Sequence, residues 1–383
     1  MVSSQAVIAA DFTEEFKTAI AAASDLRELR EKAFAAFSAL GFPTVKSEDW
    51  KYTNVAPIAG VKWRVATLDA ELEPLESEFA ELAGKFNFER NGFAALNAAL
   101  GEYVCVRIPT ESVVEKPIEL KFTAADGTAI FPHVLVIAEA GSKATIVESY
   151  AGPAKSFTSA AVQIVLQDNA NLTHYRVQKE SPAAFHVGTT EVTVGRGSLY
   201  NSTSINLGGA IARHDIDVKF TAEGGEAFVD GLYMLNGSQH SDTHSVIDHA
   251  VPNCLSHQSY KGVLNDRSRG VFNGKVFVRE NAHGTNAEQS NKNLLLSNDA
   301  RVDTKPQLEI FNDDVKCSHG ATVGQLEEEE LFYLLTRGLP DSLARNLLTY
   351  GFAEEIIRKI GIESIKTDLD EAVLHRLNVK LEV

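Results

Sequence analysis

Cysteine is scarce in this chain. Its 383 residues include only three cysteines, Cys105, Cys254 and Cys317, and no two of them form a CxxC pair. The odd number and the wide spacing exclude a disulfide framework and a structural zinc ribbon, and they indicate a reducing compartment. A conventional iron–sulfur cluster has about four thiolate ligands. Any such cluster bound here would therefore need ligands from another chain.

Basic residues and long apolar runs are also few. The chain has 36 basic and 52 acidic residues, so its net charge of -16 would repel a phosphate backbone, and we expect no nucleic-acid partner. No apolar run approaches the roughly 20 residues that span a bilayer, and MVSSQAVIAADFTEEF at the N-terminus lacks the features of a secretory signal. We therefore expect a cytoplasmic protein without a membrane partner. A hydrophobic content of 44% excludes wholesale disorder.

Both ends of the sequence predict helices. Before Gly41, apolar residues recur at spacings of three and four, namely Leu26, Leu29, Ala33, Phe37 and Leu40. A loop, residues 46–58, contains Trp50 and Tyr52, which we interpret as packing anchors. A second helical stretch is expected over Leu68 to Leu100, where Ala, Leu and Glu dominate. After Val323, three more helices are expected, the second of them starting near Asp341 or Ser342.

The middle of the chain predicts short strands. From about Gly101, runs rich in Val, Ile, Thr and Phe alternate with small polar turns such as Gly195-Arg196 and Gly208-Gly209, roughly 14 residues apart. This pattern allows a sandwich, a barrel or a solenoid. The even spacing and the lack of long connections favour a β-solenoid with about two strands per coil. We predict a mainly β protein with an N-terminal helical domain (1–100), a β core (101–323) and a C-terminal helical domain (324–383).

Two glycine-rich segments have the wrong spacing for nucleotide binding. GVFNGKV, Gly270 to Val276, has three residues between its glycines instead of four, lacks Ser or Thr after the lysine, and continues as strand. GRGSLY, Gly195 to Tyr200, lacks the third glycine of the dinucleotide fingerprint. The sequence therefore predicts no phosphate-binding loop.

Four histidines and a cysteine fall within eighteen residues, which raises the possibility of a metal site. They are His240, His244, His249, Cys254 and His257. In a strand, His240 and His244 share a face that His249 does not, and a turn at Pro252 precedes the cysteine. The spacing does not require the ligands to converge. Histidines that hydrogen-bond within a solenoid remain the favoured interpretation.

The segment FNDDVKCSHGATVGQL, Phe311 to Leu326, places a cysteine and a histidine two residues apart. In a strand, Cys317 and His319 lie on one face and Ser318 on the other. A thiolate and an imidazole at this spacing can converge on one metal ion. The alternative is a small buried cysteine in the last strand before the C-terminal helices, where a solenoid exposes its edge.

Several segments together resemble the SufB/SufD family of the Suf iron–sulfur cluster assembly system, and they resemble its SufD branch in particular. DDVKCSHGATVGQL followed by LFYLLTRGL is similar to the C-terminal SufD signature. SEDWKYTNV, YKGVLNDRSRGVFNGKVFV and LLLSNDARVDTKPQLEI also look like SufD segments, in the expected order. SufB has Glu-His-Glu-Ala where this chain has Cys-Ser-His-Gly. The resemblance covers most of the chain.

The resemblance implies a fold, two partners and a site. The fold is a right-handed parallel β-helix flanked by helical domains. The implied function is that of a non-ATPase scaffold subunit, which pairs with SufB through the end of the β-helix and docks the SufC ATPase through its C-terminal helices. The family site matches His319 and Cys317, which would hold a transient iron–sulfur cluster shared with SufB. For the SufC contact we expect Ser342, Arg345 and Asn346.

Two other functions stay open. One is a metal-dependent β-solenoid enzyme that uses the His240 to His257 cluster. The other is a structural solenoid that self-associates, because an edge that pairs with SufB could also form a homodimer. In the scaffold interpretation the chain binds no metal stably by itself, and the sulfur donor system is reached only indirectly.

Overall fold

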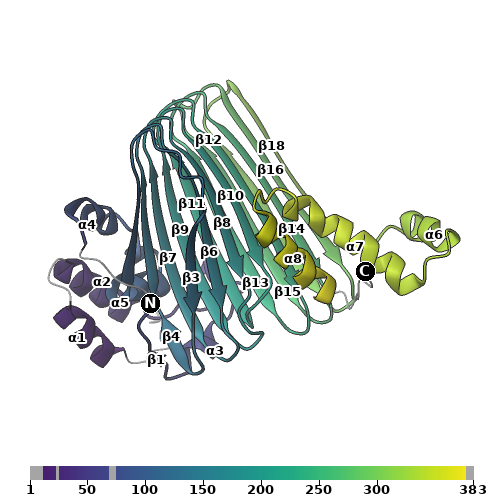
Figure 1. Cartoon of the computed structure of the whole chain (residues 1–383), viewed down its shortest axis with the longest axis horizontal. Helices are drawn as coiled ribbons and strands as arrows, with labels where there is room; N and C mark the ends of the chain where they lie inside the picture. The colour runs from purple at the N-terminus through teal and green to yellow at the C-terminus, as the bar shows by residue number, and fades with distance from the viewer. Residues whose placement is uncertain (1–11, 23–25, 69–74, 377–383) are drawn as a thin grey trace.

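The structure is a computed structural model that describes residues 12–22, 26–68 and 75–376. Its centre is a parallel β-solenoid of about eight turns, with helices at both ends (Figure 1). Each coil places one strand in each of two sheets, and every paired strand is parallel to its neighbour. The predicted fold class, a mainly β solenoid flanked by helices, is confirmed.

The first sheet has ten strands and the second has eight. The first contains β1 (Arg64–Val65), β2 (Glu102–Ile108), β4 (Thr128–Ile130), β5 (Pro132–Ala138), β7 (Phe157–Leu166), β9 (Phe185–Val194), β11 (Ile211–Phe220), β13 (His240–His249), β15 (Arg269–Val278) and β17 (Arg301–Ile310). The second contains β3 (Ile118–Thr123), β6 (Lys143–Ala151), β8 (Asn171–Gln178), β10 (Leu199–Asn206), β12 (Glu226–Leu235), β14 (Leu255–Leu264), β16 (Thr285–Leu295) and β18 (Val315–Gly324).

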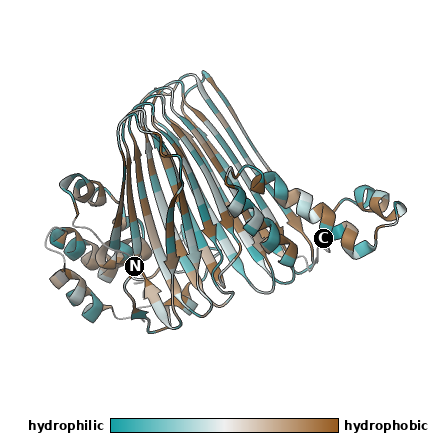
Figure 2. Ribbon diagram, viewed as in Figure 1, coloured by the Kyte–Doolittle hydropathy of each residue, from teal (hydrophilic) through white to brown (hydrophobic). Residues whose placement is uncertain are grey.

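The strands follow the predicted alternation. In β15, Phe272, Gly274, Val276 and Val278 are buried while Asn273, Lys275 and Phe277 are only partly buried. Figure 2 shows hydrophobic and hydrophilic residues alternating along many strands. The turns Gly195-Arg196 and Gly208-Gly209 flank β10 as predicted. The segment Gly270 to Val276 lies inside β15. It is therefore extended, as expected, and is not a phosphate-binding loop.

Apolar side chains pack in three layers. The interior of the solenoid holds one cluster that extends from Val106 to Phe272. The N-terminal helices cover part of the outer face of the first sheet, where Phe93 and Leu96 join Phe157 and Phe185 in a second cluster. The C-terminal helices cover part of the outer face of the second sheet, through a third cluster that includes Tyr175, Leu232, Ile356 and Val373.

The helices agree with the prediction at the C-terminal end and differ near residue 90. They are α1 (Thr13–Ala22), α2 (Arg27–Leu40), α3 (Ala56–Ala59), α4 (Ser77–Gly84), α5 (Gly92–Leu100), α6 (Glu328–Thr336), α7 (Asp341–Ile357) and α8 (Glu363–Arg376). The single helical stretch expected over Leu68 to Leu100 is wrong, because α4 ends at Gly84 and α5 begins after Asn91. The Asn91 side chain accepts hydrogen bonds from the backbone of Phe93 and Ala94, so it caps a new helix. Residues 69–74 of that stretch lie outside the described residues.

The loop at residues 46–58 contains a 3-10 turn and the short helix α3, and it is anchored to the first sheet. Trp50 is buried, and the guanidinium carbon of Arg213 lies 3.8 Å from its ring centroid. Arg213 also donates to Asp242 at 2.8 Å. Tyr52 is partly buried, with the guanidinium carbon of Arg269 at 5.4 Å from its ring. Both aromatic residues therefore serve as packing anchors, as predicted.

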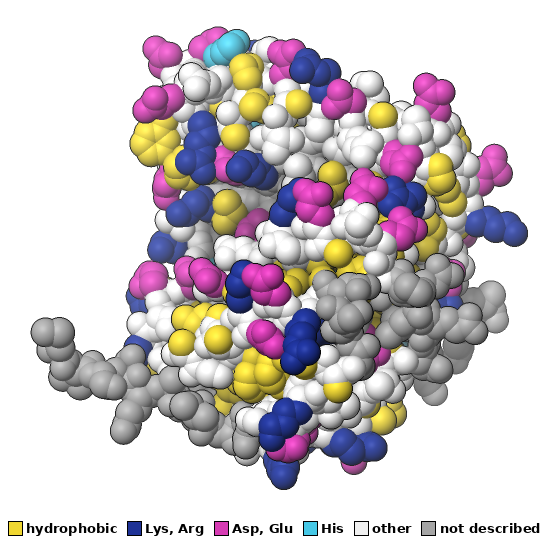
Figure 3. All heavy atoms as spheres, turned by 90° about the vertical axis from the view of Figure 1, so that its left-hand side faces the viewer, with side chains coloured by type: hydrophobic (Ala, Val, Ile, Leu, Met, Phe, Trp, Pro, Cys, Tyr) yellow, Lys and Arg dark blue, Asp and Glu magenta, His cyan; other side chains and the backbone are white. Residues whose placement is uncertain are grey.

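The N-terminal end of the molecule carries mixed charges on its surface. Figure 3 shows acidic, basic and hydrophobic side chains interspersed on this face. Within the residues that the structure describes, no helix is long and apolar enough to cross a membrane.

Removal of the Arg213 guanidinium tests how the N-terminal loop is held. Arg213→Met should lower the free energy of unfolding by about 3–5 kcal/mol, because Asp215 and Asp242 would remain buried without their ion-pair partner. Urea unfolding measures this loss. The matched control is Arg196→Met, since Arg196 is exposed in its pair with Glu223 and should change stability by less than about 1 kcal/mol. Equal effects of the two substitutions would contradict the anchor.

The buried histidine at the end of β13 predicts a pH dependence of stability. His249 is fully buried, its Nε2 lies 2.8 Å from Ser256 Oγ, and burial lowers its pKa to about 4. The unfolded chain therefore takes up this proton first as the pH falls below about 6.5, and the contribution of neutral His249 to stability is lost between about pH 6.5 and 4. The stability advantage of wild type over His249→Gln should shrink on the order of 1 kcal/mol per pH unit over this range.

Urea unfolding at pH 8, 7, 6 and 5 checks this expectation. The difference between the two proteins should be constant from pH 8 to 7 and should shrink below that. A difference that stays constant down to pH 5 would show that His249 does not titrate on unfolding in this range.

Candidate functional site

The C-terminal end of the solenoid is open within the described residues. β17 pairs only with β15, and β18 pairs only with β16, so each sheet ends in a strand with an unpaired edge. From Ser318 to Gly324 every residue of β18 is exposed. Large apolar residues are exposed beside this edge, with 40% of Ile310, 57% of Phe311 and 48% of Val323 accessible. This end has the features of a surface where a second chain can pair.

Cys317 and His319 occupy inward-facing positions of the last strand. In β16, the alternate residues from Thr285 to Asn293 are buried. Cys317 pairs in register with Ala287, and His319 pairs with Gln289, so both continue these inward columns. The prediction that the two side chains share a face is confirmed. Side chains at such positions would be buried if another coil followed, whereas His319 is exposed here.

The environments of the thiol and the imidazole differ. Cys317 packs at the edge of a small apolar cluster with Val276, Ala287 and Leu308, and burial raises the pKa of its thiol, against a smaller opposing hydrogen bond from Ala287. It is therefore protonated at neutral pH, and a metal ion or a basic group must displace its proton before the sulfur can bind. The ring of His319 has no hydrogen-bond partner among the described residues. A neutral imidazole there can bind a metal or accept a proton.

The five candidate metal ligands between His240 and His257 do not converge. His240 and His244 lie on the outer face of the first sheet, where His240 Nε2 is 2.8 Å from Thr53 Oγ1 and His244 Nε2 is 3.1 Å from Asp242. His249 and Cys254 are buried in the interior, and His257 lies on the second sheet. Among the described residues no group of three or more His, Cys, Asp or Glu side chains could hold a metal ion. This metal-site alternative is therefore wrong, because the residues are divided among the outer face of the first sheet, the interior and the outer face of the second sheet.

The second predicted surface lies on α7. Ser342 and Arg345 are exposed, and Arg345 Nε lies 2.9 Å from Asp341. Asn346 is partly buried. These polar residues were expected to form a docking face beside Leu343 and Leu347, which are 44% and 49% exposed. The prediction did not include the exposed apolar residues of α6, Phe332, Tyr333 and Leu335, which are between 37% and 68% exposed.

The geometry of the C-terminal helices presents this apolar surface away from the solenoid. α6 projects beyond the sheets, and α7 leads back to them (Figure 1). The second half of α7 is fixed by Lys261, which forms an ion pair with Glu355 and donates to the Phe352 carbonyl. Lys359, just after α7, lies 2.8 Å from Asp230. One end of the helix pair is therefore held firmly while the other is available for a partner.

A buried ionic network inside the solenoid was not predicted. His174 Nε2 lies 2.6 Å from Glu148 Oε1, and His174 Nδ1 lies 2.9 Å from the Tyr200 hydroxyl. On the following strand, β9, His186 contacts Arg176 of β8 through Nε2 and Glu180 through Nδ1. Burial alone would raise the pKa of Glu148, but His174 and a hydrogen bond from Tyr150 outweigh burial and lower it. These side chains satisfy each other's hydrogen-bonding groups, and their strands are several coils away from the open end.

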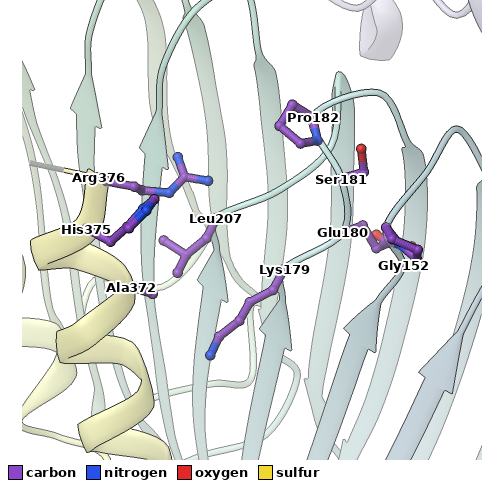
Figure 4. Close-up of a pocket in the computed structure, with 10 residues that line it drawn as sticks. Gly152, Lys179, Glu180, Ser181, Pro182, Leu207, Ala372, His375 and Arg376 are labelled. Carbon is purple, nitrogen blue, oxygen red and sulfur yellow. The ribbon is translucent and has the colours of Figure 1, made fainter. Parts of the chain in front are cut away.

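A cavity of about 320 Å³ lies where α8 meets the corner loops of the solenoid. Figure 4 shows its lining, with His375 and Arg376 on the helix, Leu207 between them and the loops, and Ser181 and Pro182 opposite. Arg376 donates to the Met234 carbonyl at 2.8 Å. The lining contains none of the predicted site residues, so this cavity is separate from the open end.

Family models match most of the chain. Residues 121–352 match the model described as "SUF system FeS cluster assembly, SufBD core domain". Residues 9–81 match the model for the SufBD protein N-terminal region. The first match covers the solenoid from β3 onward, including Cys317 and His319, and the start of the C-terminal helices.

Relatives agree with this assignment. The chain is 30% identical over 384 residues to the iron–sulfur cluster assembly protein SufD of Escherichia coli, which covers 89% of this chain and 90% of the relative. It is 39% identical over 295 residues to an iron–sulfur cluster assembly SufBD family protein of Synechocystis sp., which covers 73% of this chain and 65% of that relative. The chain thus spans just under two thirds of the Synechocystis protein. It is also 32% identical over 308 residues to the chloroplastic protein ABCI7 of Arabidopsis thaliana. The chain therefore belongs to the SufB/SufD family of the SUF iron–sulfur cluster assembly system.

Proposed function

We propose that this chain is a non-ATPase scaffold subunit that pairs with SufB through the open end of its solenoid. The observation that carries the proposal is the position of His319, which continues an inward column at a strand that no further coil covers. A second β-solenoid placed against this end would pair with the edges of β17 and β18 and bury the exposed Phe311 and Val323. His319 would then lie inside the joint interface.

At that interface the two chains would share the ligands of a nascent cluster. His319 offers a ring nitrogen, and Cys317 offers a sulfur whose raised pKa delays its binding until positive charge is close. These two groups are too few for a cluster, so the remaining ligands must come from the partner. Incomplete ligation by each chain suits a scaffold, because the cluster is cargo that must leave.

We also propose that the SufC ATPase docks on the apolar surface of α6 and α7. The exposed residues Phe332, Leu343 and Leu347 form a mixed aromatic and aliphatic patch, which is typical of the central contacts of an interface. Ser342, Arg345 and Asn346 lie among them and would supply the polar rim. ATP hydrolysis would belong to that partner, since the glycine-rich segments of this chain are a strand and a turn.

Substitution of His319 tests the shared site. After anaerobic co-expression with SufB and SufC, the wild-type chain should bring down both partners with iron and sulfide. His319→Ala should retain both partners and lose at least about tenfold of the bound iron and sulfide, because a direct ligand is removed. His257→Ala is the matched control, since this histidine lies on the outer face of the second sheet.

Three results would contradict parts of this proposal. If neither partner binds the wild-type chain, the scaffold function fails. If His319→Ala keeps its iron and sulfide, His319 is not a ligand. If the wild-type chain forms only a homodimer through this end in the presence of both partners, it is a self-associating solenoid.

Substitution of the apolar residues on α7 tests the ATPase contact. Leu343→Ala with Leu347→Ala should weaken SufC binding about tenfold or more while SufB binding is unchanged, because buried apolar contacts dominate interface affinity. Titration of SufC onto the purified complex measures this effect. Val113→Ala is the control, since Val113 is 64% exposed at the other end of the solenoid. Unchanged SufC affinity would place the contact elsewhere.

A further inference from the structure

A buried amide lies directly beneath His319. Gln289 in β16 is the register partner of His319 in β18, and only 1% of its surface is accessible. Both residues occupy the same inward column, one coil apart. Adjacent strands in a sheet lie about 4.8 Å apart, so their side chains are in contact range.

The side chain of Gln289 is held in one orientation. Its Nε2 donates to Gln258 Oε1 at 2.7 Å, and the same oxygen accepts from Ser245 Oγ at 3.1 Å. Gly274 in the facing strand leaves the space that the amide fills, since a Cβ added to this glycine would lie 2.5 Å from Gln289 Nε2. The amide is therefore fixed between the two sheets.

The carbonyl oxygen of this amide has no partner. Gln289 Oε1 is buried and accepts no hydrogen bond among the described residues. A buried acceptor left unsatisfied costs on the order of 1–3 kcal/mol, so native structures seldom retain one without a reason. Gln258 lies in the preceding coil. Because Gln289 Nε2 donates to Gln258 and the amide group is planar, the Gln289 carbonyl oxygen points away from that coil. His319 is the next residue of the column on the other side.

We propose that Gln289 is a positioning residue for His319. When the exposed ring of His319 turns toward this column, the Gln289 carbonyl oxygen would accept a hydrogen bond from one ring N–H, which would fix the tautomer and direct the lone pair of the other nitrogen toward the open end. Histidines that bind metals commonly hold their second nitrogen in this way, and loss of such a partner weakens binding. The chain thereby prepares the imidazole before a partner arrives. The role of the Gln289–His319 hydrogen bond in cluster binding rests on the proposed function, but the inference that the bond forms does not.

The tautomer of His319 can be measured in the full chain without any partner. Nitrogen-15 NMR of histidine-labelled protein at pH 8 distinguishes the two neutral tautomers, and His319→Gln identifies the signal. In wild type one tautomer should dominate. In Gln289→Met, which keeps the shape but removes the acceptor, the tautomer ratio should move toward that of free histidine by roughly two- to tenfold, as expected for the loss of one net hydrogen bond.

A matched control separates positioning from packing. Asn291→Leu replaces another buried amide two residues along β16, which pairs with Ala321 instead of His319 and donates to the Tyr260 carbonyl. This variant should leave the tautomer ratio of His319 at its wild-type value. If Gln289→Met fails to fold, Gln289→Asn keeps an amide in the core but shortens its reach, and the same change in ratio is expected.

Two results would overturn the inference. A His319 tautomer ratio that is unchanged in Gln289→Met would mean that a buried water satisfies the carbonyl oxygen. An equal change in Asn291→Leu would mean that general loosening of the core is responsible. Failure of the proposed function gives a different result. In that case the His319 tautomer ratio would still change in Gln289→Met, but the complex with His319→Ala would keep its iron and sulfide.

Discussion

Each coil of a parallel solenoid buries its inward side chains only when another coil lies against it. This constraint sets the architecture of the whole chain, because the stacking in register of two sheets creates one continuous core with two ends. The N-terminal helices and the loop around Trp50 cover part of the outer face of the first sheet. At the C-terminal end, the outer edges of β17 and β18 are paired with no further strand within the described residues. The same hydrogen-bonding geometry that builds the fold therefore leaves an unpaired edge at this end, which we propose is completed by association.

The position of the site follows from this incomplete stacking. A histidine at an inward position is ordinarily buried, as His174 and His186 are in the middle of the solenoid. His319 has the same relation to its sheet but no coil above it, so it is both aligned by the core and accessible to another chain. The small number of cysteines fits the same account, since three scattered thiols are too few to hold a cluster in this chain alone. The C-terminal helices carry a second exposed apolar surface, the one on which we propose that the ATPase docks.

Much of the fold could be predicted from the sequence, because solenoid strands alternate strictly and their turns need small polar residues at a regular spacing. The two-residue period of a strand was enough to predict that Cys317 and His319 lie on the same face. The break between α4 and α5 was missed, since the composition there favours helix throughout and the cap depends on Asn91 alone. The ionic network was missed because Glu148 and His174 are 26 residues apart and occupy inward positions where apolar residues are expected. The role of Gln289 depends on the register between coils, which varies with turn length and cannot be read from one strand.

The central claim is that the end of the solenoid formed by β17 and β18 is completed by SufB. Amide hydrogen exchange of this chain, measured alone and in complex with SufB, tests it most directly. The account predicts that the amides of β18 exchange at least about tenfold more slowly in the complex, while those of β8 and β10 exchange at the same rate in both states. Unchanged exchange in β18 in a complex shown to be fully formed would contradict the account and would place the interface on another face.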